Sequence, residues 1–478
     1  MLIHLCAANF LSFDLPVEFS MLASKESRFA ERVAAGEMLP AKVLQTGAIW
    51  GGNASGKSNF CRVLEFAQWM VVQGTRPDAT TGRKPFRLRE GAAEEPSRFV
   101  FEILVNAGGK EKMFRYSFAV TGKEVVEESL VELRSVSERV YFTRKAGKEG
   151  PEFTFDWWER KVVPDEERQF ARFVARGTKA NQLFLHEAMD RNVTLLAPVF
   201  RWFRDQLVVM QPDDDFLSLE IQEPERAQLR EYTTDLLHAA GTGITGIEAV
   251  EVPAAALGMP ADVRDKVLDS IKEDSGGVIL RSNDGGRFSA FRKDGELLTS
   301  RIVTYRTTKD GQRIPFELSE ESDGTRRVFD LAPLFHDLDH PACRKVYVID
   351  ELDRSMHCQL SEAVLKHYLE SRTRDTRAQL IFTTHDAMLL DQSLLRRDEI
   401  WFMERGTNGE TSMECLSDYK DLRYDKDVRK AYLEGRFSGV PHLKPFRRRV
   451  VRPGLLEQSE FHLNEDATDY QTPPKSSE

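Results

Sequence analysis

The sequence contains few cysteines, and their placement argues against two classes of protein. Among its 478 residues there are only five, and their number is odd. No two of them have the spacing of a metal-binding pair. We therefore expect reduced thiols in a cytoplasmic protein, rather than a disulfide framework or a zinc site. The five positions are Cys6, Cys61, Cys343, Cys358 and Cys415.

The chain also has no long hydrophobic run and no excess of positive charge. No segment reaches the roughly 18 apolar residues that a membrane-spanning helix requires. The amino-terminal stretch MLIHLCAANFLSF has no basic region ahead of an apolar one, so we expect no leader peptide. Lys and Arg number 67 against 77 Asp and Glu, a net charge of -10. This balance argues against a general polyanion-binding surface, although a local basic groove stays possible.

The most informative segment is a glycine-rich turn between an apolar run and a helical pattern. KVLQTGAIW, at 42–50, is typical of a buried strand, and SNFCRVLEFAQWMVVQ, at 58–73, has helical periodicity. The intervening GGNASGKS fits Gly-x4-Gly-Lys-Ser, the pattern of a phosphate-binding loop. In such loops, backbone N–H groups surround the phosphates of a nucleotide, and the lysine reaches the terminal ones. The predicted nucleotide-binding residues are Gly51, Gly52, Asn53, Ala54, Ser55, Gly56, Lys57, Ser58 and Asn59.

Two carboxylates follow a second apolar strand pattern, VYVIDE at 346–351. Taken alone, such a pair marks the start of a helix or turn at least as often as it marks a functional site. Beside a phosphate loop, at the carboxyl edge of a parallel sheet, the pair predicts a metal site and a catalytic base. We expect Asp350 and the Ser58 hydroxyl to hold Mg²⁺, and Glu351 to orient or deprotonate the attacking water.

Two further motifs complete the predicted site. AQLIFTTHD, at 378–386, is a strand pattern that ends in His385, a candidate sensor of the γ-phosphate. ESDGTRR, at 321–327, opens a predicted helix that ends near Leu334. Its Ser322, Gly324 and Thr325 could donate hydrogen bonds to an anion, or the serine could be a simple helix N-cap.

The remaining patterns predict an α/β protein. Residues 1–20 are typical of edge strands, 21–42 of a charged helical insertion, and 83–145 of an antiparallel sheet. Residues 165–240 have helical spacing, and the turns Asn283–Gly286, Lys293–Gly295 and Lys309–Gly311 predict three hairpins within 245–316. The predicted units are a lobe with the phosphate loop and the antiparallel sheet (1–145), a helical insertion or lid (146–276), a second lobe with ESDGTRR, the carboxylates and His385 (277–442), and a disordered tail (443–478).

These motifs together resemble the ABC-type ATPases of the SMC/RecF/OLD superfamily. NFLSF at 9–13, the phosphate loop, ESDGTRR as a variant signature, VYVIDELDRSMH and IFTTHD occur in the family's order over about 1–442. RRDEIWFMER and YLEGRFSGVP are similar to the end of one branch. That branch comprises stand-alone ATP-binding proteins of phage defence: RloA-like, abortive-infection, and PtuA-like ATPases of Septu and retron systems. The implied fold is a P-loop ATPase head whose mixed, largely parallel sheet is flanked by helices, with an antiparallel β subdomain and a helical insertion.

The resemblance implies a composite active site. Two heads of this superfamily enclose two nucleotides, so Ser322, Gly324 and Thr325 would act on the ATP bound by the partner. The resemblance also implies that Lys57, Glu351 and His385 are the catalytic residues. The signature departs from Leu-Ser-Gly-Gly-Gln, and the family's glutamine loop is not evident, with Gln182 and Gln211 both candidates. The insertion of about 110 residues has no sustained heptads and is too short for SMC-like arms.

The resemblance leads to three functional hypotheses. The favoured one is an ATPase that dimerises around Mg-ATP and senses or gates a separate effector, a nuclease or toxin, in antiphage defence. The effector would be a separate polypeptide, because the motifs reach 442 and leave no room for an OLD-type nuclease domain. The alternatives are a RecF-like DNA-maintenance ATPase, which would contact nucleic acid, and a scaffold that turns ATP over very slowly.

Overall fold

Three β-sheets and their helices make up the part of the protein that can be described. The computed structural model describes residues 1–36, 39, 41–148, 150–156, 163–212, 214, 224–253, 260–269, 271, 278–281, 287–293, 296–419 and 427–437. Residues 1–440 form one compact unit. The tail predicted to be disordered, 443–478, lies outside the described residues, and the predicted domain boundaries stay a prediction.

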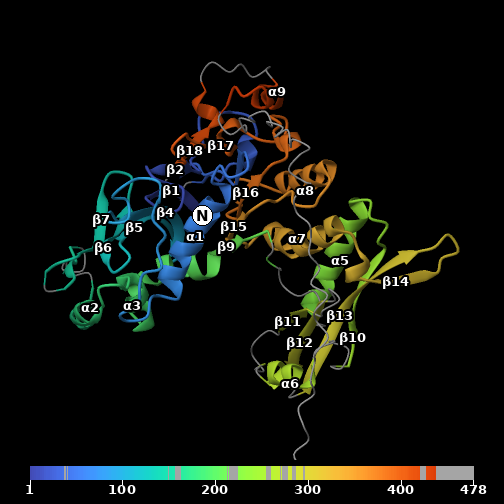
Figure 1. Cartoon of the computed structure of the whole chain (residues 1–478), viewed down its shortest axis with the longest axis horizontal. Helices are drawn as coiled ribbons and strands as arrows, with labels where there is room; N and C mark the ends of the chain where they lie inside the picture. Colours follow the sequence, from blue (N-terminus) through green and yellow to red (C-terminus); the bar gives the residue numbers. More distant parts are fainter. Residues whose placement is uncertain are drawn as a thin grey trace, which may run out of the picture. The chain divides into compact units, whose positions relative to one another are not determined.

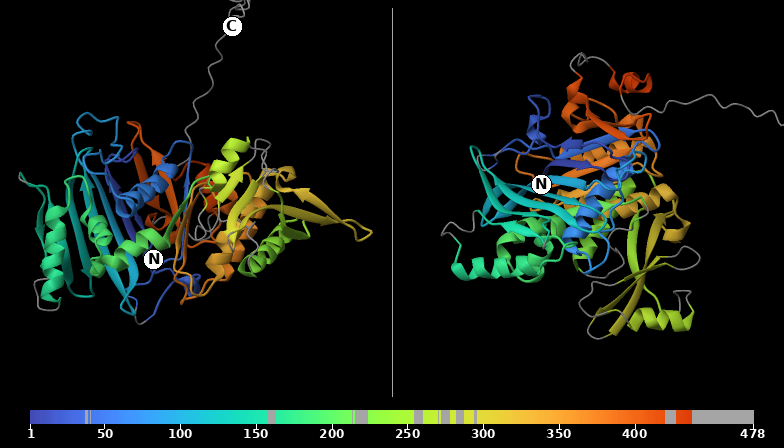
Figure 2. Two further views of the ribbon diagram at one scale, coloured as in Figure 1. Left: turned by 90° about the horizontal axis from the view of Figure 1, so that it is seen from below. Right: turned by 60° about the vertical axis from the view of Figure 1, so that its left-hand side comes forward.

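A seven-stranded antiparallel sheet occupies the amino-terminal part of the unit, in the order β2-β1-β4-β5-β6-β7-β8 (Figures 1 and 2). Strands β4 to β7 confirm the antiparallel sheet predicted from the alternating runs of 83–145. The prediction of two edge strands in 1–20 is right only for β2, because β1 pairs with β2 on one side and β4 on the other. The strands are β1 (Leu2–Ala8), β2 (Val17–Ser20), β4 (Ser97–Ala107), β5 (Lys110–Val120), β6 (Val125–Leu133), β7 (Glu138–Lys145) and β8 (Glu152–Thr154).

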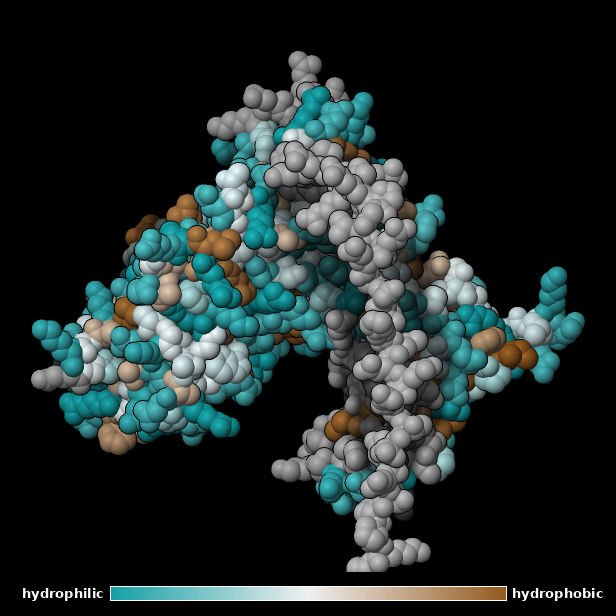
Figure 3. All heavy atoms as spheres, in the orientation of Figure 1, coloured by the Kyte–Doolittle hydropathy of each residue, from teal (hydrophilic) through white to brown (hydrophobic). Residues whose placement is uncertain are grey.

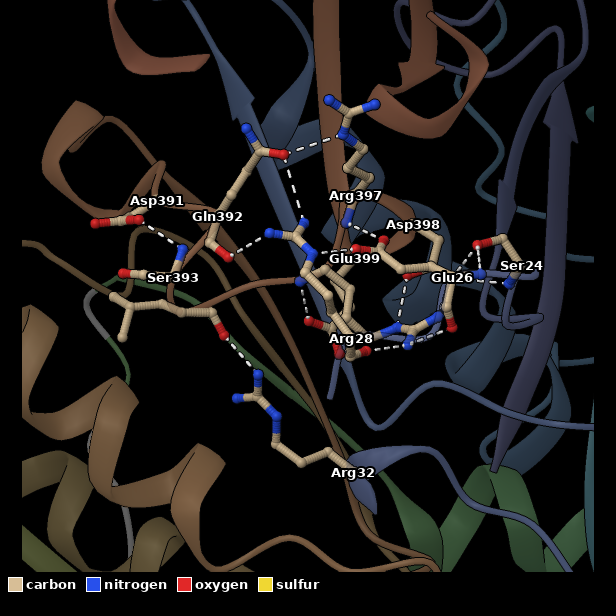
Figure 4. A network of polar contacts seen from close by, with 12 residues as sticks. Ser24, Glu26, Arg28, Arg32, Asp391, Gln392, Ser393, Arg397, Asp398 and Glu399 are labelled. Carbon is tan, nitrogen blue, oxygen red and sulfur yellow. Dashed lines mark hydrogen bonds and ion pairs between the residues drawn. The ribbon is translucent and has the colours of Figure 1, made fainter. Parts of the chain in front are cut away.

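The helix predicted within residues 21–42 is wrong for the described part of that segment. It contains only a 3-10 turn, η1 (Ala30–Arg32). Backbone hydrogen bonds lead to other segments instead, including Met21 N to Ile3 O (2.8 Å) and Ala34 N to Val43 O (2.9 Å). The Ser24 hydroxyl also donates to Asp398, and the Glu26 carboxylate accepts from the Arg397 N–H, as Figure 4 shows. Tertiary contacts therefore override the helical character of the local sequence.

The second sheet is mainly parallel and carries the motifs that were predicted to bind nucleotide. Its order is β18-β17-β3-β16-β15-β9, and every neighbouring pair is parallel except the antiparallel pair of β17 and β18. The apolar runs were predicted to be parallel strands that are buried on both faces. The pairing and the burial of these strands confirm that prediction. The strands are β3 (Thr46–Gly51), β9 (Leu207–Met210), β15 (Val346–Ile349), β16 (Gln379–Thr384), β17 (Ile400–Arg405) and β18 (Thr411–Cys415).

The third sheet is antiparallel, in the order β10-β13-β12-β11, and β14 also pairs with β13. The pairings of β11 with β12, β12 with β13, and β13 with β14 confirm the three predicted hairpins. The turn residues 283–286 and 294–295 lie outside the described residues, whereas Gly311 has a φ of 81°. The strands are β10 (Gly246–Glu251), β11 (Val278–Arg281), β12 (Arg287–Lys293), β13 (Glu296–Thr307) and β14 (Arg313–Glu317).

Helices α2 to α5 confirm the helical spacing of 165–240, which strand β9 interrupts. Helix α7 runs five residues beyond the predicted end, because its apolar face continues through Phe335 and Leu338 and accommodates Pro333. The α-helices are α1 (Lys57–Val72), α2 (Asp165–Gly177), α3 (Phe184–Asp190), α4 (Ala197–Arg201), α5 (Pro224–Ala239), α6 (Ala261–Asp269), α7 (Asp323–Asp339), α8 (Cys358–Glu370) and α9 (Val428–Leu433). Short turns are η2 (Thr194–Leu196), a π-helical turn η3 (Trp202–Gln206), η5 (Leu318–Glu320), η6 (Ala387–Leu389), η7 (Arg397–Glu399) and η8 (Leu416–Asp418).

The central strands lie between two hydrophobic clusters. Along β15, Val346 and Val348 belong to the cluster that includes α1 and the seven-stranded sheet, whereas Tyr347 and Ile349 belong to the cluster with α7 and α8. This alternation follows from the two-residue period of a strand. Burial on both faces fixes the register, so the carboxyl ends of β3, β15 and β16 have defined positions.

The surface carries no extended hydrophobic belt on the face seen in Figure 3, where hydrophobic side chains gather in small groups among hydrophilic ones. Among the described residues, none of the helices combines the length and apolar character needed to cross a bilayer.

Candidate functional site

The phosphate loop is a tight turn between β3 and α1. Ala54 (φ 63°) and Gly56 (φ 111°) have left-handed backbones, a combination that turns successive N–H groups toward one point. A Cβ on Gly51 would lie 2.6 Å from the Met403 carbonyl oxygen, and one on Gly56 would collide with Thr411. Neither glycine can therefore be replaced without moving the loop or the strands beneath it.

Lys57, the first residue of α1, is buried beneath this turn. Its Nζ donates hydrogen bonds to the carbonyls of Gly51 (2.6 Å) and Gly52 (3.2 Å) and lies 3.4 Å from His385 Nδ1. Burial lowers the pKa of Lys57 to about 8, although the nearby carboxylates of Asp350, Glu351 and Asp353 oppose this effect. The ammonium is therefore held in a site that lacks enough negative charge to balance its desolvation.

The predicted carboxylates lie at the carboxyl end of β15, beside the end of β16. Thr383 joins them, because its hydroxyl donates to Asp350 Oδ1 (2.6 Å) and accepts from the Glu351 N–H (2.8 Å). Asp350 is buried, whereas Glu351 is partly exposed and has a φ of 53°. A left-handed backbone is unfavourable for glutamate, and surrounding contacts must hold it there.

His385 lies between the lysine and the glutamate. Its Nε2 is 3.6 Å from Glu351 Oε1, and its Nδ1 faces Lys57. Burial, followed by the positive charge of Lys57, lowers the pKa of the histidine. A neutral imidazole at neutral pH can donate one hydrogen bond to an oxygen anion while its other nitrogen accepts.

These groups meet at a pocket of about 970 Å³. Nine residues predicted from the sequence line it: Asn53, Ala54, Ser55, Gly56, Lys57, Ser58, Asn59, Glu351 and His385. Eleven further lining residues were not assigned to the site: Leu11, Ser12, Arg62, Arg83, Lys84, Pro85, Phe86, Arg87, Leu88, Arg405 and Gly409. Five of these are basic, which suits a polyanionic ligand. The only sequence signals were the NFLSF segment and the cation-rich run RKPFRL.

The loop and its surroundings fit a nucleotide triphosphate with Mg²⁺. The Ser55 hydroxyl is buried without a hydrogen-bond partner, and side chains at Gly51 and Gly56 would collide with the protein beneath the loop. Ser58 lines the pocket, and Asp350 directly follows β15, which is separated from β3 by β16. The described residues include no cluster of three or more histidine, cysteine or carboxylate ligands.

The signature residues do not line this pocket. Ser322 is the N-cap of α7, and its Oγ accepts the Thr325 N–H at 3.2 Å. A Cβ on Gly324 would lie 2.7 Å from the Ser355 carbonyl oxygen, so the start of α7 packs directly on the turn after β15. Ser322 is thus a helix N-cap, one of the two roles predicted for it, whereas its contact with a second nucleotide stays a prediction.

Of the two candidate glutamines, Gln211 follows a strand of the parallel sheet. It follows β9, whose Met210 pairs with Ile349, and its Nε2 donates to Glu65 Oε1 of α1 (2.6 Å). Gln182 instead donates to the Thr75 carbonyl (3.0 Å) in a buried loop, a structural role. Neither glutamine is among the residues that line the pocket described above, so the identity of the glutamine loop stays a prediction.

Arg327 connects the signature helix to both neighbouring strand ends. It is buried, and its guanidinium donates to the carbonyls of Glu351 (3.3 Å) and Pro212 (3.4 Å). Burial lowers its pKa, and the positive charge of Arg354 acts in the same direction. The arginine thus helps to hold Glu351 in its left-handed conformation.

Comparison with known proteins places this site in a family. Residues 48–391 match the family described as "AAA domain, putative AbiEii toxin, Type IV TA system". The chain belongs to this AAA family. The match extends from within β3 past His385, so the AAA region contains the phosphate loop, both carboxylates and the histidine. This bears out the resemblance to P-loop ATPases at the level of the family.

Solved structures and curated proteins add little to the AAA assignment. The SMC head domain from Thermotoga maritima matches with 13% identity and a TM-score of 0.33, covering 87% of this chain and 98% of that one. An SmcHead bound to the C-winged helix domain of ScpA matches with 12% identity and a TM-score of 0.38, covering 88% and 99%. A search of curated proteins gave no match.

Proposed function

We propose that this chain binds Mg-ATP and hydrolyses it as one half of a two-headed ATPase. One observation carries the proposal: Lys57, Glu351 and His385 come from three different elements and converge on one pocket above a phosphate-type loop. A site for structural nucleotide binding alone needs no carboxylate and histidine 3.6 Å apart at its mouth.

Each residue has a definite role in the proposed reaction. The loop N–H groups and Lys57 hold the phosphates, and Ser58 and Asp350 would hold Mg²⁺, which neutralises charge on the phosphate oxygens. Glu351 takes a proton from a water molecule while the water oxygen attacks the γ-phosphorus. The bond between the γ-phosphorus and the bridging oxygen of the β-phosphate breaks, giving ADP and phosphate. His385 donates a hydrogen bond to the transferred group. Ser322, Gly324 and Thr325 of a second copy would complete the site.

We further propose that ATP state regulates a separate effector in antiphage defence. The matched family is described by a putative toxin and a type IV toxin–antitoxin system, and the signature resembles that of defence ATPases. The effector would be a nuclease or toxin encoded nearby. Direct contact with nucleic acid is an alternative that a local basic surface would support.

One purification tests both parts of this proposal. The tagged chain, expressed with its neighbouring genes, is purified and its mass measured by mass photometry with and without Mg-ATP. We expect an even-numbered assembly with ATP that carries a second polypeptide. An even-numbered assembly without a second polypeptide would overturn the effector proposal alone. A mass that ignores ATP, with phosphate release at background, would overturn the two-headed ATPase and leave a scaffold.

The lowered pKa of Lys57 predicts a pH dependence of ATP binding. The phosphates attract the ammonium form, which is present below pH 8 and lost as the pH rises through about 8. Binding above this pH must take up a proton, so at pH 9 we expect ATP affinity about tenfold weaker than at pH 7. Calorimetry in buffers of different ionisation enthalpy would measure both the affinity and the proton uptake.

The control for this prediction is Lys57→Arg, because a guanidinium stays charged across the range. Its affinity at pH 7 is expected to be lower, since the longer side chain fits the buried site poorly, but it should not change up to pH 9. Equal affinity of the wild type at pH 7 and pH 9, without proton uptake, would show that Lys57 is fully charged throughout.

A further inference from the structure

An ion pair with a buried carboxylate ties the signature motif to the third sheet. Glu321 directly precedes Ser322, and only 2% of its side chain is exposed. Arg306 of β13 donates to both of its carboxylate oxygens, at 2.8 and 2.7 Å, and the Thr304 hydroxyl donates to Oε1 at 2.7 Å. Burial alone would raise the pKa of Glu321, but these hydrogen bonds outweigh it and the pKa is lowered.

This contact differs from the other ion pairs described on the same sheet. The pair of Arg313 and Glu248 has the same charges, but its side chains are 50% and 47% exposed. Exposed pairs contribute little, because water and salt screen them. The two-point geometry at Glu321 fixes the orientation of the carboxylate as well as its position.

The signature loop is therefore held from two sides. On one side, Glu321 is fixed to β13, one residue before the N-cap of α7. On the other, Gly324 packs against the Ser355 carbonyl in the turn that follows the catalytic carboxylates. Only Ser322, the N-cap, lies between Glu321 and the first residue of α7, so a displacement of β13 would be passed on to Ser322.

We propose that Arg306 and Thr304 are positioning residues: through Glu321 they hold the signature residues Ser322, Gly324 and Thr325 in place. The β10–β14 sheet would thereby control the rate of ATP turnover. The inference rests on the proposed two-headed ATPase, since the signature acts on nucleotide held by the partner. A ligand or protein that shifts this sheet would thereby change the rate of hydrolysis without touching the nucleotide pocket.

The test compares Arg306→Met with Arg313→Met, which removes an exposed pair from the same sheet. We expect Arg306→Met to lower kcat by about tenfold to 100-fold, as displacement of a positioned group by about 1 Å does. ATP affinity of the separate chain should stay within about twofold, because its own pocket is intact. Arg313→Met should match the wild type in both. Glu321→Gln, which keeps the side-chain size, replaces Arg306→Met if the latter does not fold.

A mixing experiment separates positioning from general damage. Lys57→Ala has an impaired pocket but an intact signature, whereas Arg306→Met has the reverse. Mixed dimers contain one complete site, so the mixture should hydrolyse ATP faster than the sum of the separate variants. A mixture no faster than that sum, or wild-type kcat in Arg306→Met, would overturn the inference. Absence of ATP-dependent association and hydrolysis in the wild type would instead overturn the proposed function.

Discussion

Replacing Glu351 with glutamine is expected to lower the rate of ATP hydrolysis by about 10²–10⁴-fold, the usual contribution of a general base. The carboxylate is partly exposed at the mouth of the pocket and lies 3.6 Å from His385, where it can accept a proton from water. Glutamine keeps the shape and the backbone contacts with Thr383 and Arg327, so ATP binding should persist. Phosphate release measures turnover, and mass photometry should show an ATP-bound dimer that no longer dissociates.

Glu370→Gln is the matched control, because Glu370 is an exposed glutamate of α8 whose ion pair with Lys366 spans 3.9 Å. It should hydrolyse ATP at the wild-type rate and dissociate after turnover. Retention of most activity in Glu351→Gln would remove Glu351 from the catalytic role. Loss of hydrolysis without a trapped assembly would leave the base in place but contradict the two-headed arrangement.

The sequence was sufficient to predict the elements that carry the candidate site, because their signals are local. The loop from Gly51 to Ser58 requires glycines at fixed positions, and the flanking patterns of β3 and α1 span only a few residues each. Strands β15 and β16 are apolar on both faces, so they had to be central and parallel. Parallel central strands end at one edge, which brings the residues after them together.

The rest of the pocket depends on contacts that are distant in the sequence. Thr411 begins β18, yet its hydroxyl bonds to the Ser55 carbonyl (2.9 Å) and to Ser12 (2.8 Å), so three distant segments support one loop. Arg405 reaches the pocket only because β17 pairs with β3. Likewise, the position of Gln211 next to the parallel sheet depends on the pairing of β9 with β15, which lies far away in the sequence. Periodicity carries no information about such pairings.

Residues 21–36 show the same limitation, and they lead to the largest stability effect that we expect. The sequence suggested a charged helical insertion, whereas the Glu26 and Arg28 carbonyls accept hydrogen bonds from Arg396. Ser24 donates to Asp398, as Figure 4 shows. These two side chains are 1% and 4% exposed and share two hydrogen bonds of 2.9 and 2.7 Å. Arg396 also donates to the carbonyls of Glu26 (3.2 Å) and Arg28 (2.5 Å).

Arg396→Met should lower the free energy of unfolding by about 3–5 kcal/mol, the usual result of removing one partner of a buried ion pair. The variant leaves the buried Asp398 carboxylate without its guanidinium partner and retains the hydrogen bonds from the Ser24 N–H and hydroxyl, both at 2.7 Å. It also removes the guanidinium that holds the Glu26 and Arg28 carbonyls. Urea unfolding of the wild type and the variant, followed by circular dichroism, measures the difference.

Arg204→Met provides the comparison, because Arg204 and Asp205 form a two-point pair of similar geometry with both side chains 48% exposed. Its loss should cost no more than about 1 kcal/mol. The double variant Arg396→Met/Asp398→Leu should recover part of the loss, since it removes the unpaired buried charge together with its partner. Equal costs for Arg396→Met and Arg204→Met, or no recovery in the double variant, would mean that the network does not hold residues 24–32 against the segment that leads into β17.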